Sequence, residues 1–369
     1  MISRFYVHNF RCLENFDLPI SKRPSTLLVG ENGSGKSTVV SALEVLQKLA
    51  RGTNRVGEIL KPADLSRGRS EVPLRFEIEC VLGARAYEYI LALELPPTFK
   101  ELRVAEERLS IDGDPVYSRD RAQVTIFRTS SDREATFLVD WHLVALPLIQ
   151  VKSEGDSLHV FKSWLARMLI LAPIPSQIDG DSSGDSLTPD RWVKNFGEWI
   201  SGLLAHSPAA YTAIHGFLTK VMPDLKDFQN PQVGRDYRSL SVRFQQDQAT
   251  LELPFRELSD GEKCFFICAV VLASNHAYGP ILCFWDEPDN FLSPSEVGHF
   301  VMGLRRAFQS GGQLIVTSHN LEGIAQFSRE NTLLLHRRSH FDPTLVRPLS
   351  ELSINGDLTG ALIRGDLME

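Results

Sequence analysis

The feature that most constrains this chain is a glycine-rich segment near its beginning. It follows an apolar run that ends at Val29 and precedes a stretch of helical character from Val39 to Ala50. Its residues are Gly30, Glu31, Asn32, Gly33, Ser34, Gly35, Lys36, Ser37 and Thr38. Glycines let successive backbone N–H groups turn inward, the helix start adds partial positive charge, and Lys36 adds a full one. A strand, a turn and a helix in this order predict a cradle for phosphate rather than a chance glycine-rich turn.

The spacing Gly-x-x-x-x-Gly-Lys-Ser is the P-loop pattern, and it predicts a bound nucleotide with Mg²⁺. In such a loop the backbone and Lys36 hold the phosphates, and the hydroxyl of Ser37 holds Mg²⁺. We therefore expect every residue of the segment except Glu31 to contact the nucleotide.

Two further apolar runs end in side chains suited to hydrolysis. The run Pro280–Trp285 is followed by Asp286 and Glu287, and the run Gln313–Ser318 is followed by His319. The carboxyl ends of parallel strands face a ligand at one edge of a sheet. Asp286 suits the Mg²⁺ shell, and Glu287 suits the general base that orients and deprotonates an attacking water.

A fourth segment, Leu258–Lys263, begins a helix with Ser259 and a glycine. Its backbone N–H groups make this helix start a second place where an anion can bind. The residues that follow, Cys264–Ala273, are apolar on every side, so we predict that this helix is buried. Cys264 and Cys268 are interpreted as small core residues.

These four segments, in this order, resemble the motifs of the ATP-binding-cassette ATPases. The Walker A motif is residues 30–38, the signature is 258–262, the Walker B motif with its acid is 281–287, and the switch histidine is His319. The opening residues Phe5–Arg11, with the sequence FYVHNFR, are similar to the start of the soluble branch that contains the RecF, SMC and OLD ATPases. Residues 73–251 follow only the general plan of that branch.

The resemblance implies an α/β fold of the ABC-ATPase head type. Its parts are a P-loop core sheet that is mixed or parallel, an antiparallel β meander and a helical lobe. A chain of 369 residues exceeds the size at which one core keeps growing. We predict that residues 1–178 form the first part of the ATP-binding lobe, 179–239 the helical lobe and 240–369 the second part of the ATP-binding lobe.

The resemblance also implies roles for single residues. Glu287, His319 and Lys36 are the expected catalytic residues. Arg11 is expected to reach the nucleotide, and Gln177 is the candidate Q-loop residue at the metal, with Gln150 as the alternative.

The signature of such an ATPase faces ATP bound by a second subunit, which implies a homodimer that sandwiches two ATP molecules. Ser259, Gly261 and Glu262 are then expected to meet the partner's γ-phosphate. The sequence Ser-Asp-Gly-Glu departs from the transporter-like Ser-Gly-Gly-Gln but keeps the serine and the glycine.

Several expectations concern the segments between the motifs. Residues 2–7 and 13–20 are predicted as strands packing beside the P-loop strand, and 72–95 as a β-hairpin that starts an antiparallel meander. Trp141 and His142 are predicted to pack in the core. Residues 161–168, 192–204 and 208–221 are predicted as helices, 240–253 as a hairpin, and 179–190 as a mobile linker.

Charge limits the partners of this chain. The formal net charge of −7 disfavours a protein that coats nucleic acid by bulk charge, so any DNA contact must be local. The segment Arg51–Ser70 has a positive balance and is either such a phosphate contact or a solvated loop. Neither a signal peptide nor an apolar run of about 20 residues is present, so we expect a cytoplasmic protein without a membrane partner.

Three functions compete at this stage. The first is an ATPase acting on DNA in genome maintenance or antiphage defence, with a separately encoded effector because a nuclease domain would not fit in the fifty residues after His319. The second is a regulatory scaffold in which an ATP-held dimer cages a toxin or nuclease without binding DNA. The third is the ATP subunit of a transporter, which ranks last because the interval between Lys36 and Ser259 is long.

Overall fold

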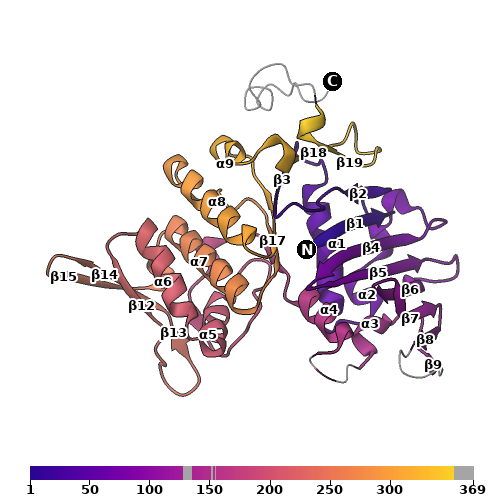
Figure 1. Cartoon of the computed structure of the whole chain (residues 1–369), viewed down its shortest axis with the longest axis horizontal. Helices are drawn as coiled ribbons and strands as arrows, with labels where there is room; N and C mark the ends of the chain where they lie inside the picture. The colour runs from indigo at the N-terminus through magenta and orange to yellow at the C-terminus, as the bar shows by residue number, and fades with distance from the viewer. Residues whose placement is uncertain (128–134, 151–152, 154, 353–369) are drawn as a thin grey trace. The chain divides into compact units, whose positions relative to one another are not determined.

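The computed structural model describes residues 1–127, 135–150, 153 and 155–352, which form two compact units (Figure 1). The first unit contains residues 1–23 and 28–168 and the described part of 329–369. The second unit contains residues 24–27 and 169–328. Among the described residues, no helix combines the length and apolarity needed to cross a membrane.

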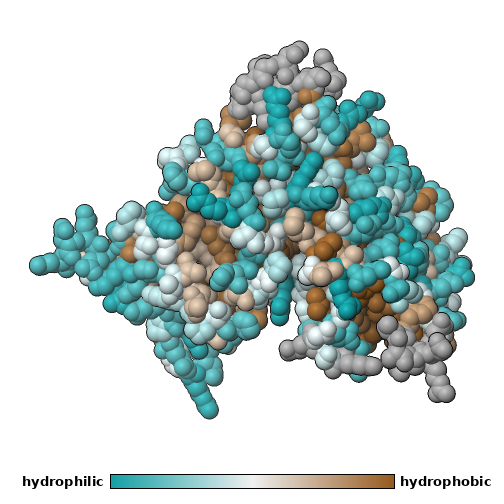
Figure 2. Space-filling view, in the orientation of Figure 1, coloured by the Kyte–Doolittle hydropathy of each residue, from teal (hydrophilic) through white to brown (hydrophobic). Residues whose placement is uncertain are grey.

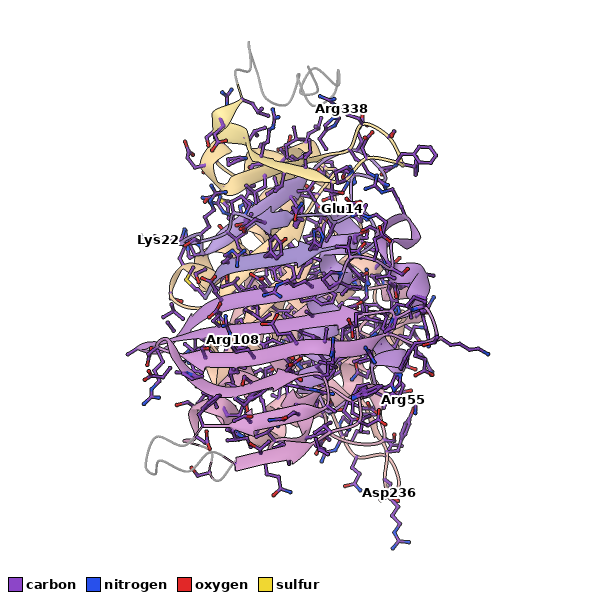
Figure 3. All side chains as sticks on the ribbon, turned by 90° about the vertical axis from the view of Figure 1, so that its right-hand side faces the viewer. Glu14, Lys22, Arg55, Arg108, Asp236 and Arg338 are labelled. Atoms are coloured by element: carbon purple, nitrogen blue, oxygen red, sulfur yellow. The ribbon has the colours of Figure 1, made fainter. Side chains whose placement is uncertain are left out.

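An antiparallel sheet dominates the first unit (Figure 3). The described strands follow the order β2-β1-β4-β5-β6-β7-β8-β9. Their bounds are β1 Ile2–His8, β2 Phe16–Leu18, β4 Leu74–Leu82, β5 Arg85–Glu94, β6 Arg103–Ile111, β7 Asp114–Asp120, β8 Gln123–Ile126 and β9 Ala135–Leu138. Side chains of β4 alternate between buried and less buried positions, as expected for a sheet with one face on a core.

Helices of the first unit cover one face of this sheet. Their bounds are α1 Lys36–Ala50, α2 Val56–Ile59, α3 Ala145–Leu148 and α4 Ser157–Ala166. The ring of Phe161 on α4 stacks on Tyr87 of β5 with 5.5 Å between the ring centroids. Helix α1 packs in turn against α3 and α4, so the helix that follows the P-loop is fixed by the core.

A buried carboxylate holds the start of α3. Glu107 on β6 is fully buried and accepts hydrogen bonds from the hydroxyls of Tyr117, at 2.8 Å, and Tyr89, at 3.1 Å. It also accepts the backbone N–H groups of Ala145, at 2.7 Å, and Leu146, at 2.8 Å. Four donors compensate for the lost hydration of the carboxylate, so this group serves the fold rather than chemistry.

Parallel strands form the sheet of the second unit. Strand β16 (Leu282–Trp285) lies between β10 (Leu169–Leu171) and β17 (Gln313–Thr317), and both pairings are parallel. Every residue of these three strands is buried, as is usual for parallel sheets. The N–H of Leu314 on β17 donates to the carbonyl of Pro24, which places the start of the P-loop strand beside β17.

Helices and smaller sheets complete the second unit. The helices are α5 Phe196–His206, α6 Ala210–Val221, α7 Asp260–Tyr278, α8 Pro294–Gln309 and α9 Leu321–Ala325. Strands β12 Leu225–Gln229, β14 Ser241–Gln246 and β15 Ala249–Pro254 form an antiparallel sheet whose outer surface is hydrophilic (Figure 2). The short strands β11 Asp181–Ser182 and β13 Arg238–Ser239 pair with each other.

The P-loop strand β3 (Ser25–Val29) is buried along its whole length and runs from the second unit into the first. In the first unit, β18 (Thr332–His336) pairs antiparallel with β19 (Leu345–Pro348). A parallel sheet, an antiparallel meander and a set of helices confirm the predicted fold class. The predicted domain boundaries at residues 178 and 239 stay a prediction.

Several local predictions need correction. Strand β1 pairs with β2 on one side and with β4 on the other, so neither β1 nor β2 pairs with the P-loop strand. Trp141 is 39% exposed and lies over the guanidinium of Arg103, so it is not a core residue. Part of the predicted mobile linker is built into the fold, because β11 pairs with β13 and Ser186 donates its N–H to the carbonyl of Glu198.

Candidate functional site

The P-loop has the backbone that its glycines predict. Gly30, Gly33 and Gly35 all have positive φ, and Gly35 at φ 106° is the residue from which α1 starts. A side chain at Gly30 would lie 2.2 Å from the carbonyl oxygen of Leu335, and one at Gly35 would lie 2.5 Å from the hydroxyl of Thr344. Both positions therefore require glycine for space as well as for conformation.

Lys36 is held over this loop. Its Nζ donates to the carbonyl of Gly30 at 2.6 Å and to that of Glu31 at 3.1 Å, and the residue is only 8% exposed. The side chain thus curls back along the cradle, where an anionic ligand would meet its charge. Ser37 and Asn32 are exposed, so the hydroxyl of Ser37 is accessible to a metal ion.

The loop is braced from one side by Thr344, the residue before β19. Thr344 donates its hydroxyl to the carbonyl of Ser34 at 2.9 Å, and its N–H donates to the carbonyl of Cys12 at 2.8 Å. The thiol of Cys12 lies 3.4 Å from the hydroxyl of Thr38. Segments distant in sequence therefore fix the position of the P-loop within the first unit.

Arg11 lies beside α1. Its Nε donates to Asp64 at 2.9 Å, and its Nη1 donates to the hydroxyl of Ser41, one turn after Ser37, at 3.0 Å. The side chain is about half exposed. A role at the nucleotide stays a prediction for this residue.

In the second unit, the ends of β16 and β17 bring three predicted residues together. Asp286 and Glu287 follow β16, and Thr317 ends the neighbouring strand β17. Thr317 donates its hydroxyl to Asp286 Oδ1 at 2.6 Å and accepts the N–H of Glu287 at 2.9 Å. His319 Nε2 lies 3.3 Å from Glu287 Oε1. The predicted acids and the predicted histidine therefore form one cluster.

The carboxylate of Glu287 is held from two sides. Asn290 donates its amide to Oε2, while His319 faces Oε1. Glu287 also has a φ of 50°, a left-handed conformation that residues other than glycine rarely adopt. Such conformations gather at functional sites, where the surrounding structure compensates for the strain.

Three residues of this cluster were missed by the sequence interpretation. Thr317 and Asn290 are described above, and Arg191 lies with its Nη2 3.9 Å from Asp286 Oδ2. A hydroxyl at the end of the strand beside the acid-bearing strand could have indicated Thr317. No sequence signal connects Arg191 to Asp286, because the two residues are far apart in the chain.

A second carboxylate is buried next to this cluster. Asp289 is 1% exposed and accepts the hydroxyl of Ser318 at 2.6 Å. Burial raises the pKa of Asp289 above its ordinary value, and the charge of Glu287 acts in the same direction. A side chain on Gly323 would lie 2.3 Å from Asp289 Oδ2, so this carboxyl fills a closely fitted site.

The signature segment begins α7 with a capping box. Ser259 Oγ accepts the N–H of Glu262 at 3.3 Å, and Glu262 Oε2 accepts the N–H of Ser259 at 2.7 Å. The segment faces an open hollow of about 640 Å³, which Ser259, Gly261 and Glu262 help to line. The helix behind it is buried as predicted, and burial raises the pKa of Cys264 to about 12.

Gln177 is exposed at the end of a short 3₁₀ turn, Pro175–Gln177. The carbonyl of Pro175 accepts the Nζ of Lys263 on α7 at 3.1 Å, so this turn is tied to the signature helix. The role of Gln177 at a metal ion stays a prediction.

The cations of the basic segment 51–70 are less available to a phosphate ligand than the composition of the segment indicates. It contains α2 and two 3₁₀ turns, and each of its cations has a partner within the first unit. Arg55 pairs with Glu101 at 3.1 Å, and Arg67 and Arg69 share Glu14 at 2.6 and 2.7 Å. The partners of Arg51 and Lys61 are the backbone carbonyls of Ala166 and Gly57.

Residues 25–324 match a protein family described as "AAA domain, putative AbiEii toxin, Type IV TA system". The chain is 48% identical over 46 residues to an OLD nuclease of Thermus scotoductus, a match that covers 12% of this chain and 8% of that protein. It is 31% identical over 110 residues to the energy-coupling factor transporter ATP-binding protein EcfA2 of Mesoplasma florum, covering 30% of this chain and 34% of that one. The chain therefore spans only a small part of the first relative and about a third of the second.

Two solved structures share the fold. An SMC head bound to the C-winged helix domain of ScpA has a TM-score of 0.54 at 14% identity, with 95% of this chain and 99% of that chain covered. An Smc head domain with an extended coiled coil, bound to the C-terminal domain of ScpA from Pyrococcus furiosus, has a TM-score of 0.52 at 12% identity, with 100% and 99% covered. At these identities the likeness is one of fold.

Proposed function

This chain belongs to the AAA-domain family that matches residues 25–324, and we propose that it binds ATP with Mg²⁺ and hydrolyses the ATP. The P-loop supports binding, because its backbone and Lys36 suit the phosphates. Ser37, Asp286 and Gln177 are the residues proposed for Mg²⁺, which, when bound, would neutralise charge on the phosphates.

The arrangement of Glu287 is the observation that carries this proposal. Its carboxylate lies at the carboxyl end of a parallel strand, held by Asn290 and faced by His319. A carboxylate fixed in this way can accept a proton from water and keep that water oriented. Thr317 links the backbone of Glu287 to Asp286, so the general base and the proposed metal ligand keep a fixed spacing.

We further propose that the working form is a homodimer in which each signature meets ATP bound by the other copy. The capping serine of α7 supports this, because Ser259, whose hydroxyl is hydrogen-bonded to Glu262, is exposed at a helix N-terminus that lines an open hollow.

Replacing Glu287 by Gln tests both parts of the proposal. The amide keeps the size of the side chain but cannot accept the proton, so hydrolysis should fall by about 10² or more while ATP stays bound. The dimer should then accumulate with ATP and Mg²⁺ in size exclusion, and adding Ser259→Arg should return it to monomer.

Lys36→Ala serves as the control, since it should lower ATP affinity by about an order of magnitude. Wild-type turnover by Glu287→Gln would place the base elsewhere. Turnover by a protein that stays monomeric with every nucleotide would overturn the dimer.

For the biological role, we propose antiphage defence or DNA maintenance together with a separately encoded effector. The family description, which includes a toxin, supports a defence role. A scaffold that cages a toxin or nuclease without contacting DNA is the second candidate. The ion pairs of Arg55, Arg67 and Arg69 favour it, because cations neutralised by acids attract phosphate less. DNA-stimulated ATPase activity would support the first candidate, and stable co-purification with a neighbouring gene product would support the second.

A further inference from the structure

Within the loop between β18 and β19, residues 337–342 present an exposed aromatic side chain and an exposed cation, Arg338. We call these residues the hairpin tip. Phe341 is 79% exposed, and Arg338 and His340 are exposed beside it (Figure 3 labels Arg338). Single exposed apolar residues are common, so exposure alone decides nothing.

The hairpin tip is held in one conformation by hydrogen bonds within the first unit. Arg337 donates to the carbonyl of Asp342 at 2.7 Å and also to that of His340. Ser339 donates to the carboxylate of Asp342 at 2.6 Å, and Arg67 donates to the carbonyl of Phe341 at 3.0 Å. A loop ordered before binding loses little conformational entropy when it binds, which suits a contact surface.

The hairpin tip also adjoins the P-loop. A small cavity of about 200 Å³ is lined by residues 31–34 on one side and by 335–340 on the other. Thr344, just beyond the tip, donates its hydroxyl to Ser34 of the P-loop. A contact made by the tip is therefore placed next to the proposed nucleotide.

The hollow in front of the signature is complementary to the hairpin tip in charge and in apolar character. Its lining includes apolar side chains and four carboxylates, and the described lining residues include no cation. The apolar members are Val221, Met222, Pro223, Phe265 and Phe291, and the acids are Asp224, Asp260, Glu262 and Glu296. Two helix starts, those of α7 and α8, border this hollow.

We infer that the hairpin tip of one copy inserts Phe341 into the signature hollow of a second copy. Arg338 and His340 then face the carboxylates, of which Asp224 is exposed and lies outside both capping boxes. The inference rests on the proposed dimer and extends it, because it adds a direct protein contact beside the shared ATP. Apolar contact supplies affinity, and charge complementarity fixes the pairing.

Charge reversal in the Glu287→Gln background tests the contact. Dimerisation with ATP and Mg²⁺ is measured by sedimentation velocity. Arg338→Glu or Asp224→Arg alone should each weaken the homodimer by about tenfold, and Phe341→Ala should do the same. An equimolar mixture of the Arg338→Glu and Asp224→Arg chains should restore dimer, because each tip then meets a hollow of opposite charge. A contact within one chain would gain nothing from mixing.

The controls reverse exposed charges that belong neither to the hairpin tip nor to the lining of the hollow. Lys22→Glu in the first unit and Asp236→Lys in the second should leave the dimer unchanged (Figure 3). If Glu287→Gln dimerises and none of the tip or hollow variants weakens it, the inserted tip is wrong and the ATP sandwich stands. If both charge reversals weaken the dimer but the mixture does not recover, the pairing between copies is wrong. If Glu287→Gln itself never dimerises with ATP, the sandwich and the contact fall together.

Discussion

At the scale of residues, one hydroxyl organises the acids at the end of β16. Thr317 donates to Asp286 and accepts from the N–H of Glu287, so a single side chain sets the spacing of the two acids. The parallel register pairs Trp285 with Val316, which puts the next residue of each strand side by side. A backbone feature, the register, thus determines which side chains can cooperate.

Asp289 gives a pH-dependent prediction. Burial raises its pKa in the folded protein above the ordinary 3.8, so the folded state binds the proton more tightly than the unfolded state. Stability contributed by this group is present below pH 3.8 and is lost as the pH rises through the folded pKa. Asp289→Asn removes the charged form, so it should be more stable than the wild type at pH 7 and lose that advantage near pH 3.8. Urea unfolding at several pH values measures the difference.

Ser318→Ala provides the matched control, because it removes the hydroxyl that Asp289 accepts. Ser318→Ala should lower the free energy of unfolding below that of the wild type at pH 7, because the buried carboxylate of Asp289 then lacks its hydrogen-bond donor. An Asp289→Asn variant whose stability difference is the same at all pH values would contradict the raised pKa.

At the scale of elements, the signature helix depends on its first turn. Helix α7 is buried on nearly all sides, and its only reciprocal cap is the pair Ser259 and Glu262. Burial directs the helix, and the cap satisfies backbone donors that would otherwise have no partner in the helix.

Removing the cap distinguishes the role of Ser259 in stability from its proposed role in the dimer. Ser259→Ala should lower the free energy of unfolding by about 1 kcal/mol, because the N–H of Glu262 loses its acceptor. It should also weaken the ATP-dependent dimer. Ser259→Thr keeps a hydroxyl and should retain most of both properties. Guanidinium unfolding and sedimentation of the same samples give the two readouts. Loss of stability with an unchanged dimer would confine Ser259 to capping.

Elements close to the motifs were predictable because their signals are local. Helix α1, the ends of β16 and β17, and β18 follow from apolar runs and from residues adjacent in sequence. Strand β7 was missed, since its residues Asp114–Asp120 are mostly polar and their partners are set by the neighbouring strands. The ion pair of Arg67 with Glu14 could not be predicted, because nothing local indicates which distant acid a cation meets.

At the scale of the whole molecule, the groups needed by the proposed ATPase are divided between the two units. The first unit holds the P-loop and the hairpin tip, and the second holds the acids, the histidine and the signature. Neither unit carries the full set, so the proposed turnover depends on both. A single motif is therefore weaker evidence of ATPase activity than the combination of all the motifs in one chain.

The last prediction concerns DNA. Arg55 pairs with Glu101, and Arg67 and Arg69 share Glu14, so these three cations leave only one positive charge in excess. Replacing all three by Gln should therefore lower the log–log slope of duplex DNA binding against salt by about one unit at most. Three real phosphate contacts would instead lower the log–log slope by about three units. The same variant should unfold at a lower temperature, because the largely buried Glu14 loses both cations.

Glu14→Gln is the control for Arg67 and Arg69, since it removes the ion pairs of these two residues but keeps every positive charge. It should share the loss of stability, and by freeing Arg67 and Arg69 it should, if anything, strengthen binding to phosphate. If DNA binding falls in the triple variant and rises in Glu14→Gln, these ion pairs break when DNA binds and the arginines contact phosphate. The proposal of a scaffold that does not contact DNA would then be wrong. If binding follows neither change, this segment stabilises the first unit, and any DNA contact must lie elsewhere in the chain.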